Sequence, residues 1–417
     1  MSTTPFPGEL SLSTGEFTFS RGVSAPPLPS LQMGRPGQEE PIGTAGQVAT
    51  RTRLRLPSQR PLFPGCPALF VQMKGTLTEM HAVAGLVREE GMGAVITVAV
   101  KDKKKRLAEL AAAHRDLAGS CENVMFDANR YFGDSRVIGP ADLDHSWIQA
   151  QWSTGCRYAL TDSPYIGSGN LKALESVLSQ TAAFGGRVVA ALPLHIDWLL
   201  GDADRLIAAI NASGVPVALI IEHRRDPFAL PKAVLGLLKV LAQVKVNVSL
   251  LRCDLSAIGA VAFGASVGAI GTTTSLRHLF PIVAKDTKRR GGGAQIAAYV
   301  PSCMTYRTLE KIFDAINADF AHQERWKCTC RYCDGELLSG IVDDVRAYQH
   351  SLASIAVMAE DLLTGSSSPA AMGKSWVEKC RHAQFVNLEI EADTGIHWET
   401  PKFLGAWHQA LPQDPPT

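Results

Sequence analysis

Short apolar runs alternate with segments of helical period through the middle of the chain, and this repeat restricts the fold more than any other feature. Each run is apolar throughout, which is typical of strands buried on both faces of a parallel sheet. Between the runs, residues such as Leu230, Val234 and Leu241 recur on one helical face. The eight runs cover residues 68–73, 94–100, 123–126, 158–160, 188–192, 217–221, 246–251 and 266–270.

Eight strand–helix units within about 200 residues predict a (β/α)8 barrel. A doubly wound open sheet is the alternative, but no Gly-x-Gly-x-x-Gly follows the first run. We expect the barrel over residues 65–284, after an arm at 1–64 that is rich in Pro, Gly and Ser. Within the arm, residues 17–19 and 51–56 have the composition of short strands.

The composition is that of a globular protein, with 46% hydrophobic and 19% charged residues. The formal net charge of +1 provides no overall field toward a polyanion, so nucleic-acid contacts must come from local basic patches. No apolar run approaches the ~20 residues that cross a bilayer. Nine cysteines without a secretory leader fit a reducing compartment, so we expect a cytoplasmic protein without a membrane partner.

Three cysteines lie within six residues, in the sequence Cys328-Thr-Cys330-Arg-Tyr-Cys333. This spacing places three thiolates on one side of a tight loop, and a histidine from a following helix completes the ligand set of a closed structural zinc site. His350 is the predicted fourth ligand, and His382 is the alternative. The cysteine knuckle therefore predicts one structural Zn²⁺.

The zinc ligands fall in a predicted helical module at residues 285–365, which follows the last strand. A basic, glycine-rich loop at 285–293 opens it, and a helix at 308–320 leads to the cysteines. A second helix carries His350, with a predicted packing face at Ile341, Val345, Tyr348, Leu352 and Ile355. The tail at 366–417 contains Pro and Trp but predicts no further element.

Ionisable side chains follow six of the eight runs, at the strand ends where such barrels form their active sites. Carboxylates there suit acid/base or nucleophilic work on a cationic ligand or a hydrogen-bonding purine edge, and they also resemble a divalent-metal site. For Asp254 and Asp197, a helix N-cap is the competing interpretation. The candidate catalytic residues are Asp127, Asp162 and Asp254, and the candidate substrate-binding residues at strand ends are His195, Glu222, His223 and Arg252.

Two basic clusters flank the same rim of the predicted barrel. Residues 101–106 contain five Lys or Arg residues after the second run, and Lys288, Arg289 and Arg290 follow the eighth. Most charge runs are solvated helix faces. Two basic clusters at one rim, however, are typical of a surface that binds a phosphate backbone. We therefore predict nucleic-acid contact.

The knuckle and one strand end together resemble the tRNA-guanine transglycosylase superfamily over residues 62–363. Residues 328–333 and the helix at 345–350 are similar to that family's cysteines and following histidine, and 126–132 resembles its Asp-Ser-Gly-Gly-Phe-Gln segment. The resemblance implies exchange of guanine for a 7-deazaguanine base through a covalent link between an aspartate and the sugar C1′. It also implies that Asp127 is the general acid/base.

The chain departs from the family at three places. Ala128, Asn129 and Arg130 stand where the family has Ser-Gly-Gly, and residues 222–225 replace its base-recognition loop. The last run, 264–270, lacks the family's nucleophilic aspartate. Either Asp254 or Asp162 takes the nucleophilic role, or the chain does not form the covalent link. These departures favour a divergent branch of the superfamily, similar to the transglycosylase-like proteins that insert 7-deazaguanine bases into DNA.

Three functions follow as hypotheses. The first is base exchange in a nucleic acid, DNA ahead of tRNA, with a partner subunit or a second copy of the chain as further partner. The second is a protein on the same scaffold that binds nucleic acid or a partner without turnover. The third is a metal-dependent hydrolase, which would need a second, exchangeable metal at the rim carboxylates.

Overall fold

The computed structural model describes residues 60–98, 103–282, 295–366 and 368–411, all of which belong to one unit that spans 51–417. The predicted strands at 17–19 and 51–56 lie outside the described residues, as do Lys101 and the cluster of Lys288, Arg289 and Arg290. Within the described part of the chain, no helix has both the length and the apolarity to span a membrane.

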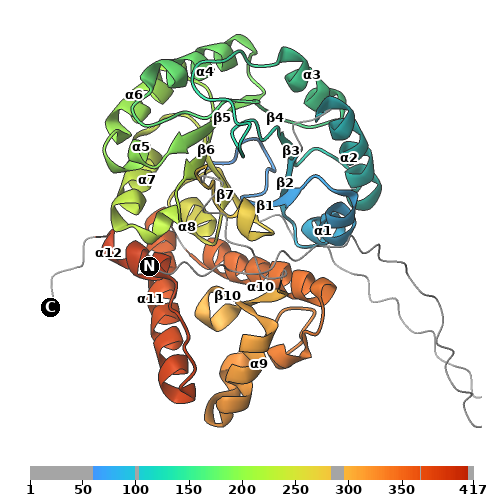
Figure 1. Ribbon diagram of the computed structural model, residues 1–417, viewed down its shortest axis with the longest axis vertical. Coiled ribbons are helices and arrows are strands. Elements are labelled where there is room, and N and C mark those ends of the chain that lie inside the picture. The colour runs from blue at the N-terminus through green and yellow to red at the C-terminus, as the bar shows by residue number, and fades with distance from the viewer. Residues whose placement is uncertain (1–59, 99–102, 283–294, 367, 412–417) are drawn as a thin grey trace, which may run out of the picture. The chain divides into compact units, whose positions relative to one another are not determined.

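Eight parallel strands form a nearly closed barrel, which confirms the predicted fold class (Figure 1). Hydrogen-bonded neighbours follow the order β3-β2-β1-β8-β7-β6-β5-β4, and pairing of β1 with β8 joins the first strand to the last. Every predicted apolar run overlaps one of these strands. Their bounds are β1 Leu69–Lys74, β2 Gly93–Thr97, β3 Val124–Asp127, β4 Ala159–Leu160, β5 Val188–His195, β6 Val217–Glu222, β7 Val248–Cys253 and β8 Val267–Gly271.

Helices follow the strands and surround them (Figure 1). Thr76 and Asn170 cap two of them by accepting hydrogen bonds from backbone N–H groups of the first turn. These helices are α1 Leu77–Glu89, α2 Lys103–Ala118, α3 His145–Ser153, α4 Leu171–Ala183, α5 Asp197–Leu200, α6 Ala203–Ser213, α7 Pro231–Gln243 and α8 Ser256–Ala262, with short 3-10 turns at Pro227–Ala229 and Thr274–Leu276.

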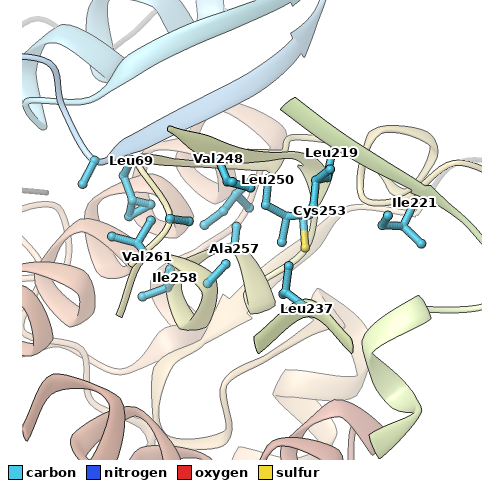
Figure 2. Packing of buried hydrophobic residues seen from close by; sticks show 14 of the residues in the cluster. Leu69, Leu219, Ile221, Leu237, Val248, Leu250, Cys253, Ala257, Ile258 and Val261 are labelled. Carbon is cyan, nitrogen blue, oxygen red and sulfur yellow. The ribbon is translucent and has the colours of Figure 1, made fainter. Parts of the chain in front are cut away.

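Two apolar layers explain why the strand runs lack polar alternation. Side chains such as Phe70, Val95 and Leu251 fill the barrel interior, and their sequence neighbours point outward to the helices. Figure 2 shows this outer layer, where Leu250 and Leu219 of the strands pack toward α7 and α8. Both faces of each strand are therefore buried, as the runs predict.

Helix α10 (Asp344–Thr364) stands where the eighth helix of the barrel belongs. Its Leu352 and Ile355 join the apolar layer around the barrel, and the helix contacts α1 and α8. The predicted packing face is correct at these positions and wrong at Val345, which is 59% exposed. Before α10 come an antiparallel hairpin, β9 Ala297–Val300 and β10 Thr305–Thr308, helix α9 Leu309–Ala318, and 3-10 segments at Pro301–Cys303, Phe320–Trp326 and Leu338–Gly340.

Two further helices, α11 Pro369–Thr394 and α12 Lys402–Gln409, occupy the tail for which the sequence predicted no element. Trp376 and Trp407 are fully buried and meet edge to face, with ring centroids 5.7 Å apart. The indole N–H of Trp407 donates to the Ser256 hydroxyl at the start of α8, 2.9 Å away. The buried Trp376 and Trp407 side chains thus pack the C-terminal tail against the barrel.

Candidate metal centre and strand-end networks

Cys328, Cys330, Cys333 and His350 converge on one buried point, as predicted. Their ligand atoms all lie within 4.8 Å of one another, and each residue is at most 5% exposed. The loop is tight because the backbone N–H of Cys333 donates to the carbonyl of Cys330 at 3.0 Å, and Asp334 takes a left-handed φ of 50°. Three thiolates and one imidazole in a closed pocket fit tetrahedral zinc.

The orientation of His350 suits metal binding. Its Nδ1 lies 3.2 Å from the Cys333 sulfur, and its Nε2 lies 2.6 Å from the carbonyl oxygen of Tyr299. Donation from Nε2–H to that carbonyl leaves the Nδ1 lone pair for a metal, the usual arrangement around metal-bound histidines. The alternative ligand, His382, is exposed on α11 and is not part of the cluster.

The thiols of the knuckle share hydrogen bonds that ionise one of them first: Cys328 and Cys330 raise the pKa of the Cys333 thiol. Hydrogen bonds from Cys328 and Cys333 lower the pKa of the Cys330 thiol, so the cluster favours a thiolate, which is the form that binds zinc. Arg331, between the last two cysteines, pairs with Glu89 at 2.6 Å and with Glu90 at 2.7 Å. These ion pairs join the knuckle to the end of α1, and so connect the candidate metal centre to the barrel.

A second buried cluster surrounds Asp127 at the end of β3. Its Oδ2 accepts hydrogen bonds from Tyr131 at 2.6 Å, Gln72 at 3.1 Å and Thr97 at 3.3 Å. Its Oδ1 accepts the backbone N–H of Asn129 at 2.8 Å. Asp127 is 1% exposed. Its carboxylate is held by side chains of two neighbouring strands, β1 and β2, and by groups of the loop after β3.

Arg252 extends this cluster to β7. Its backbone N–H donates to the Gln72 side-chain oxygen at 2.6 Å, and its guanidinium donates to the Asn129 side-chain oxygen at 2.8 Å. The guanidinium carbon lies 4.5 Å from the ring centre of Phe132. Asn129 and Arg252 both hold left-handed backbone, with φ values of 53° and 50°. Burial, followed by the charge of Asp127, raises the pKa of Tyr131 well above its ordinary value.

The other predicted rim carboxylates have their own cationic partners. Asp162 is 1% exposed and lies 2.7 Å from the Lys103 ammonium and 2.8 Å from the Arg130 guanidinium. Glu222 is 4% exposed and is bonded to Arg136 and to the Tyr165 hydroxyl. The sequence predicted the two acids, but nothing in it indicated these partners.

The two predicted histidines at strand ends lie closer to the surface. The side chain of His195 is 36% exposed, and its Nδ1 lies 3.1 Å from the Asp197 carboxylate. Asp197 is the first residue of α5 and not its N-cap. The backbone N–H of His223 donates to Leu279, from the segment after β8, at 2.9 Å. The structure thus brings Asp127 and Arg252 into one network and leaves Asp162, Glu222 and His195 in separate pairs.

The segment after β8 crosses the barrel mouth, a path that no sequence pattern predicted. Leu279 forms a parallel bridge with Glu222 at the end of β6, and its side chain is fully buried in the barrel's interior layer. Its neighbour His278 is 9% exposed, packs on Phe280 with ring centres 3.9 Å apart, and leaves its Nε2 without a hydrogen-bond partner. This segment closes the interior of the barrel from above.

His278 makes stability sensitive to acid. Burial lowers its pKa from 6.5 to about 4, so between these values the unfolded chain binds more protons than the folded chain. We therefore expect the free energy of unfolding to fall as pH drops from 6.5 toward 4, by on the order of 3 kcal/mol from this group. Urea unfolding at pH 7 and at pH 4.5 measures this change in the free energy of unfolding. His278→Leu should remove the part of the change that comes from His278. Exposed His397, replaced by Gln, is the control and should leave the loss unchanged.

Comparison with known proteins adds no family. No family model and no curated protein matches the chain. Among solved structures, a thiamine phosphate pyrophosphorylase from Pyrococcus furiosus is 14% identical, with TM-score 0.27, over 50% of this chain and 89% of that one. A probable tagatose 6 phosphate kinase from Sinorhizobium meliloti is 12% identical, with TM-score 0.31, over 82% of this chain and 98% of that one.

A multifunctional pyruvate carboxylase from Rhizobium etli is 13% identical, with TM-score 0.32, over 82% of this chain and 32% of that one. Likenesses at these scores support no statement about function. What the geometry itself establishes is an eight-stranded α/β barrel with a C-terminal helical region, whose buried Cys3His cluster fits a metal such as zinc.

Proposed function

We propose that the chain is a zinc-containing, transglycosylase-like enzyme that exchanges guanine for a 7-deazaguanine base in nucleic acid, DNA ahead of tRNA. The reaction is displacement at the sugar C1′ by a carboxylate, departure of the old base, and attack by the new one. A carboxylate suits this role because it stabilises an oxocarbenium-like sugar and leaves again.

The observation that carries an enzymatic role is the strained polar network at the barrel's carboxyl rim. Asn129 and Arg252 hold left-handed backbone there, at on the order of 1–3 kcal/mol each. Asn129 is hydrogen-bonded both to the buried carboxylate of Asp127 and to Arg252. Active sites of such barrels form at this rim. Two strained residues in one hydrogen-bond network with Gln72 and Tyr131 support a functional site at the carboxyl ends of the strands.

The candidate metal centre supports the resemblance from which the base-exchange reaction is taken. Its three cysteines and the histidine on the following helix have the arrangement that the family uses, and all four are buried. Four protein ligands fill a tetrahedral site, so zinc here would hold structure and not activate water. The chemistry is therefore left to side chains at the rim.

Support for nucleic-acid binding comes from the start of α2, although the described part of that cluster is partly engaged. Lys103 pairs with Asp162, and Arg106 donates to the carbonyl of Gly75. Lys104 and Lys105 are exposed. Lys104 also donates to the Ser146 hydroxyl and lies 3.7 Å from the Asp144 carboxylate, so Lys105 is the lysine of this segment that is more open to phosphates at the rim. The 7-deazaguanine base and a second copy of the chain remain proposed partners.

Mass spectrometry of nucleosides from DNA and from tRNA, in cells with and without this gene, tests the function. We expect a 7-deazaguanine nucleoside in DNA only when the gene is present. Asp127→Asn should reduce its formation at least about a hundredfold, because the carboxylate either moves a proton or orders the rim, while nucleic-acid binding persists. Exposed Asp116 on α2, replaced by Asn, is the matched control and should leave the product unchanged.

One observation favours a second candidate, a protein that binds nucleic acid or a partner without turnover. Asp127 and Asp162 are both buried and bonded to several donors, and β8 ends at Gly271, which Thr272 follows, without a carboxylate. If neither wild type nor Asp127→Asn changes DNA or tRNA nucleosides, while both bind oligonucleotides equally, the binding protein replaces the enzyme.

A further inference from the structure

A pocket of about 420 Å³ opens between the ends of β6 and β7 and the C-terminal helices. Two carboxylates from adjacent strand ends line it, Asp226 after β6 and Asp254 directly after β7. The lining also includes Arg277, Tyr306 of β10, Lys402 at the start of α12 and the exposed carboxylate of Glu399. Its volume is within the range of about 300–1,000 Å³ that is usual for small-molecule sites.

The two carboxyl groups are oriented by backbone hydrogen bonds. Asp226 accepts from the N–H of Phe228 at 2.9 Å, and Asp254 accepts from the N–H of Leu255 at 2.9 Å. The N-cap of α8 is Leu255, so the predicted helix-cap role does not account for Asp254. Of the three catalytic candidates, Asp127 and Asp162 are 1% exposed, whereas Asp254 is partly exposed and lines a pocket.

Burial, together with the charge of Asp254, raises the pKa of Asp226 to about 7. Asp226 therefore keeps its proton at pH values below about 7, beside a second carboxylate. A protonated carboxyl group beside a second carboxyl group can act as the proton donor while its neighbour acts as the nucleophile. Nothing in the sequence indicated Asp226, because it lies in a loop beyond the strand end.

Other lining residues supply cations and a phenol. The Arg277 guanidinium carbon lies 3.5 Å from the ring centre of Tyr306, and its Nε donates to the carbonyl of Gly271 at 3.2 Å. Burial raises the pKa of Tyr306 to about 12, so its hydroxyl stays a donor. Met304, before this tyrosine, holds left-handed backbone with a φ of 50°. Arg277 and Lys402 suit the phosphate of a nucleotide.

We propose that Asp254 and Asp226 are the nucleophile and proton donor that break the N-glycosidic bond of a nucleotide bound in this pocket. The assignment rests on the base-exchange function proposed above. Asp127 then acts as a positioning residue, because its network fixes Arg252, two residues before Asp254. The pocket, and not the closed interior of the barrel, takes the substrate.

The reaction balances without any further reagent. An Asp254 oxygen bonds to C1′ as the C1′–nitrogen bond breaks, and the departing base takes the proton of Asp226. The entering base then attacks C1′, the bond from C1′ to Asp254 breaks, and the N–H proton of the new base passes to Asp226. Two displacements at one carbon retain its configuration.

Exchange of labelled guanine into a DNA oligonucleotide and into tRNA, with wild type, Asp254→Asn, Asp226→Asn and the control Asp116→Asn, tests the pair. For wild type we expect kcat/KM to fall as pH rises through about 7. Asp226→Asn should lose that pH dependence and at least about a hundredfold in rate, and Asp254→Asn should lose both exchange and a covalent protein–DNA species on denaturing gels. Thermal unfolding checks that each variant folds.

The outcomes separate this inference from the function on which it rests. If the wild type exchanges guanine and both Asp226→Asn and Asp254→Asn keep its exchange rate within about threefold, the catalytic roles of Asp226 and Asp254 are overturned. The base-exchange function itself is then unaffected. Inactive wild type on both substrates overturns base exchange together with the catalytic roles. Calorimetric titration with guanosine 5′-monophosphate then tests whether the pocket binds nucleotides. Binding that Lys402→Met weakens about tenfold would support a nucleotide site without catalysis. Absence of binding would overturn the nucleotide site as well.

Discussion

Replacing Cys330 with serine is expected to remove the metal and to lower the midpoint of thermal unfolding of the whole chain by on the order of 10 °C or more. Structural zinc sites contribute apparent binding free energies of about 10–16 kcal/mol, and 1 kcal/mol corresponds to about 2–4 °C in a large domain. Cys330 is 1% exposed and its pKa is already lowered by Cys328 and Cys333. Metal analysis of the purified protein, followed by calorimetry of both forms, measures the effect.

The loss should reach the barrel because the metal centre and the barrel share α10. His350 lies on one face of this helix, and Leu352 and Ile355 pack on the barrel from another. The Arg331 pairs with Glu89 and Glu90 form the second connection. A chelator that removes the metal should therefore act on the wild type as the substitution does.

Cys303 provides the matched control for Cys330. It is fully buried in the apolar cluster of the same module but is not one of the four ligands. Cys303→Ser should keep the metal and lose only the modest free energy of a changed packing contact. Purified wild type without metal, and equal unfolding midpoints for wild type and Cys330→Ser, would show that the cysteines are ordinary core residues.

Replacing Asp162 with alanine is expected to destabilise the chain by about 3–5 kcal/mol, because removal of one partner of a buried ion pair leaves an uncompensated charge. The Asp162 side chain is fully buried, and the Lys103 and Arg130 groups that face it are only 16% and 18% exposed. Its Oδ1 also accepts the backbone N–H of Asp144 at 2.8 Å. Urea unfolding at neutral pH gives the free energy directly.

The exposed ion pair of Glu122 with Arg157 is the control for Asp162. Its side chains are 39% and 45% exposed, so Glu122→Ala should cost less than about 1 kcal/mol. A loss for Asp162→Ala as small as the control's would mean that the carboxylate does not hold the rim together. Asp162 would then return to consideration as the nucleophile.

The polar rim shows what sequence reasoning reaches and what it misses. Asp127, Arg252 and Glu222 were predicted as rim residues because each follows an apolar run. Their partners were not predictable, because Tyr165 and Gln72 come from other strands and loops. Whether a carboxylate is accessible or ion-paired depends on residues far away in the sequence, and this is why Asp127 and Asp254, similar in local sequence context, lie in such different surroundings.

The eight strands and the metal ligands were predictable from local sequence. A strand buried on both faces must be apolar along its length, and the spacing of Cys328, Cys330 and Cys333 places three thiols on one turn. Only the packing of the folded chain brings Leu279 to the barrel mouth and places Asp226, Asp254 and Tyr306 around one pocket. Those contacts join separate loops, whose paths depend on the packing of the whole chain and not on any local period.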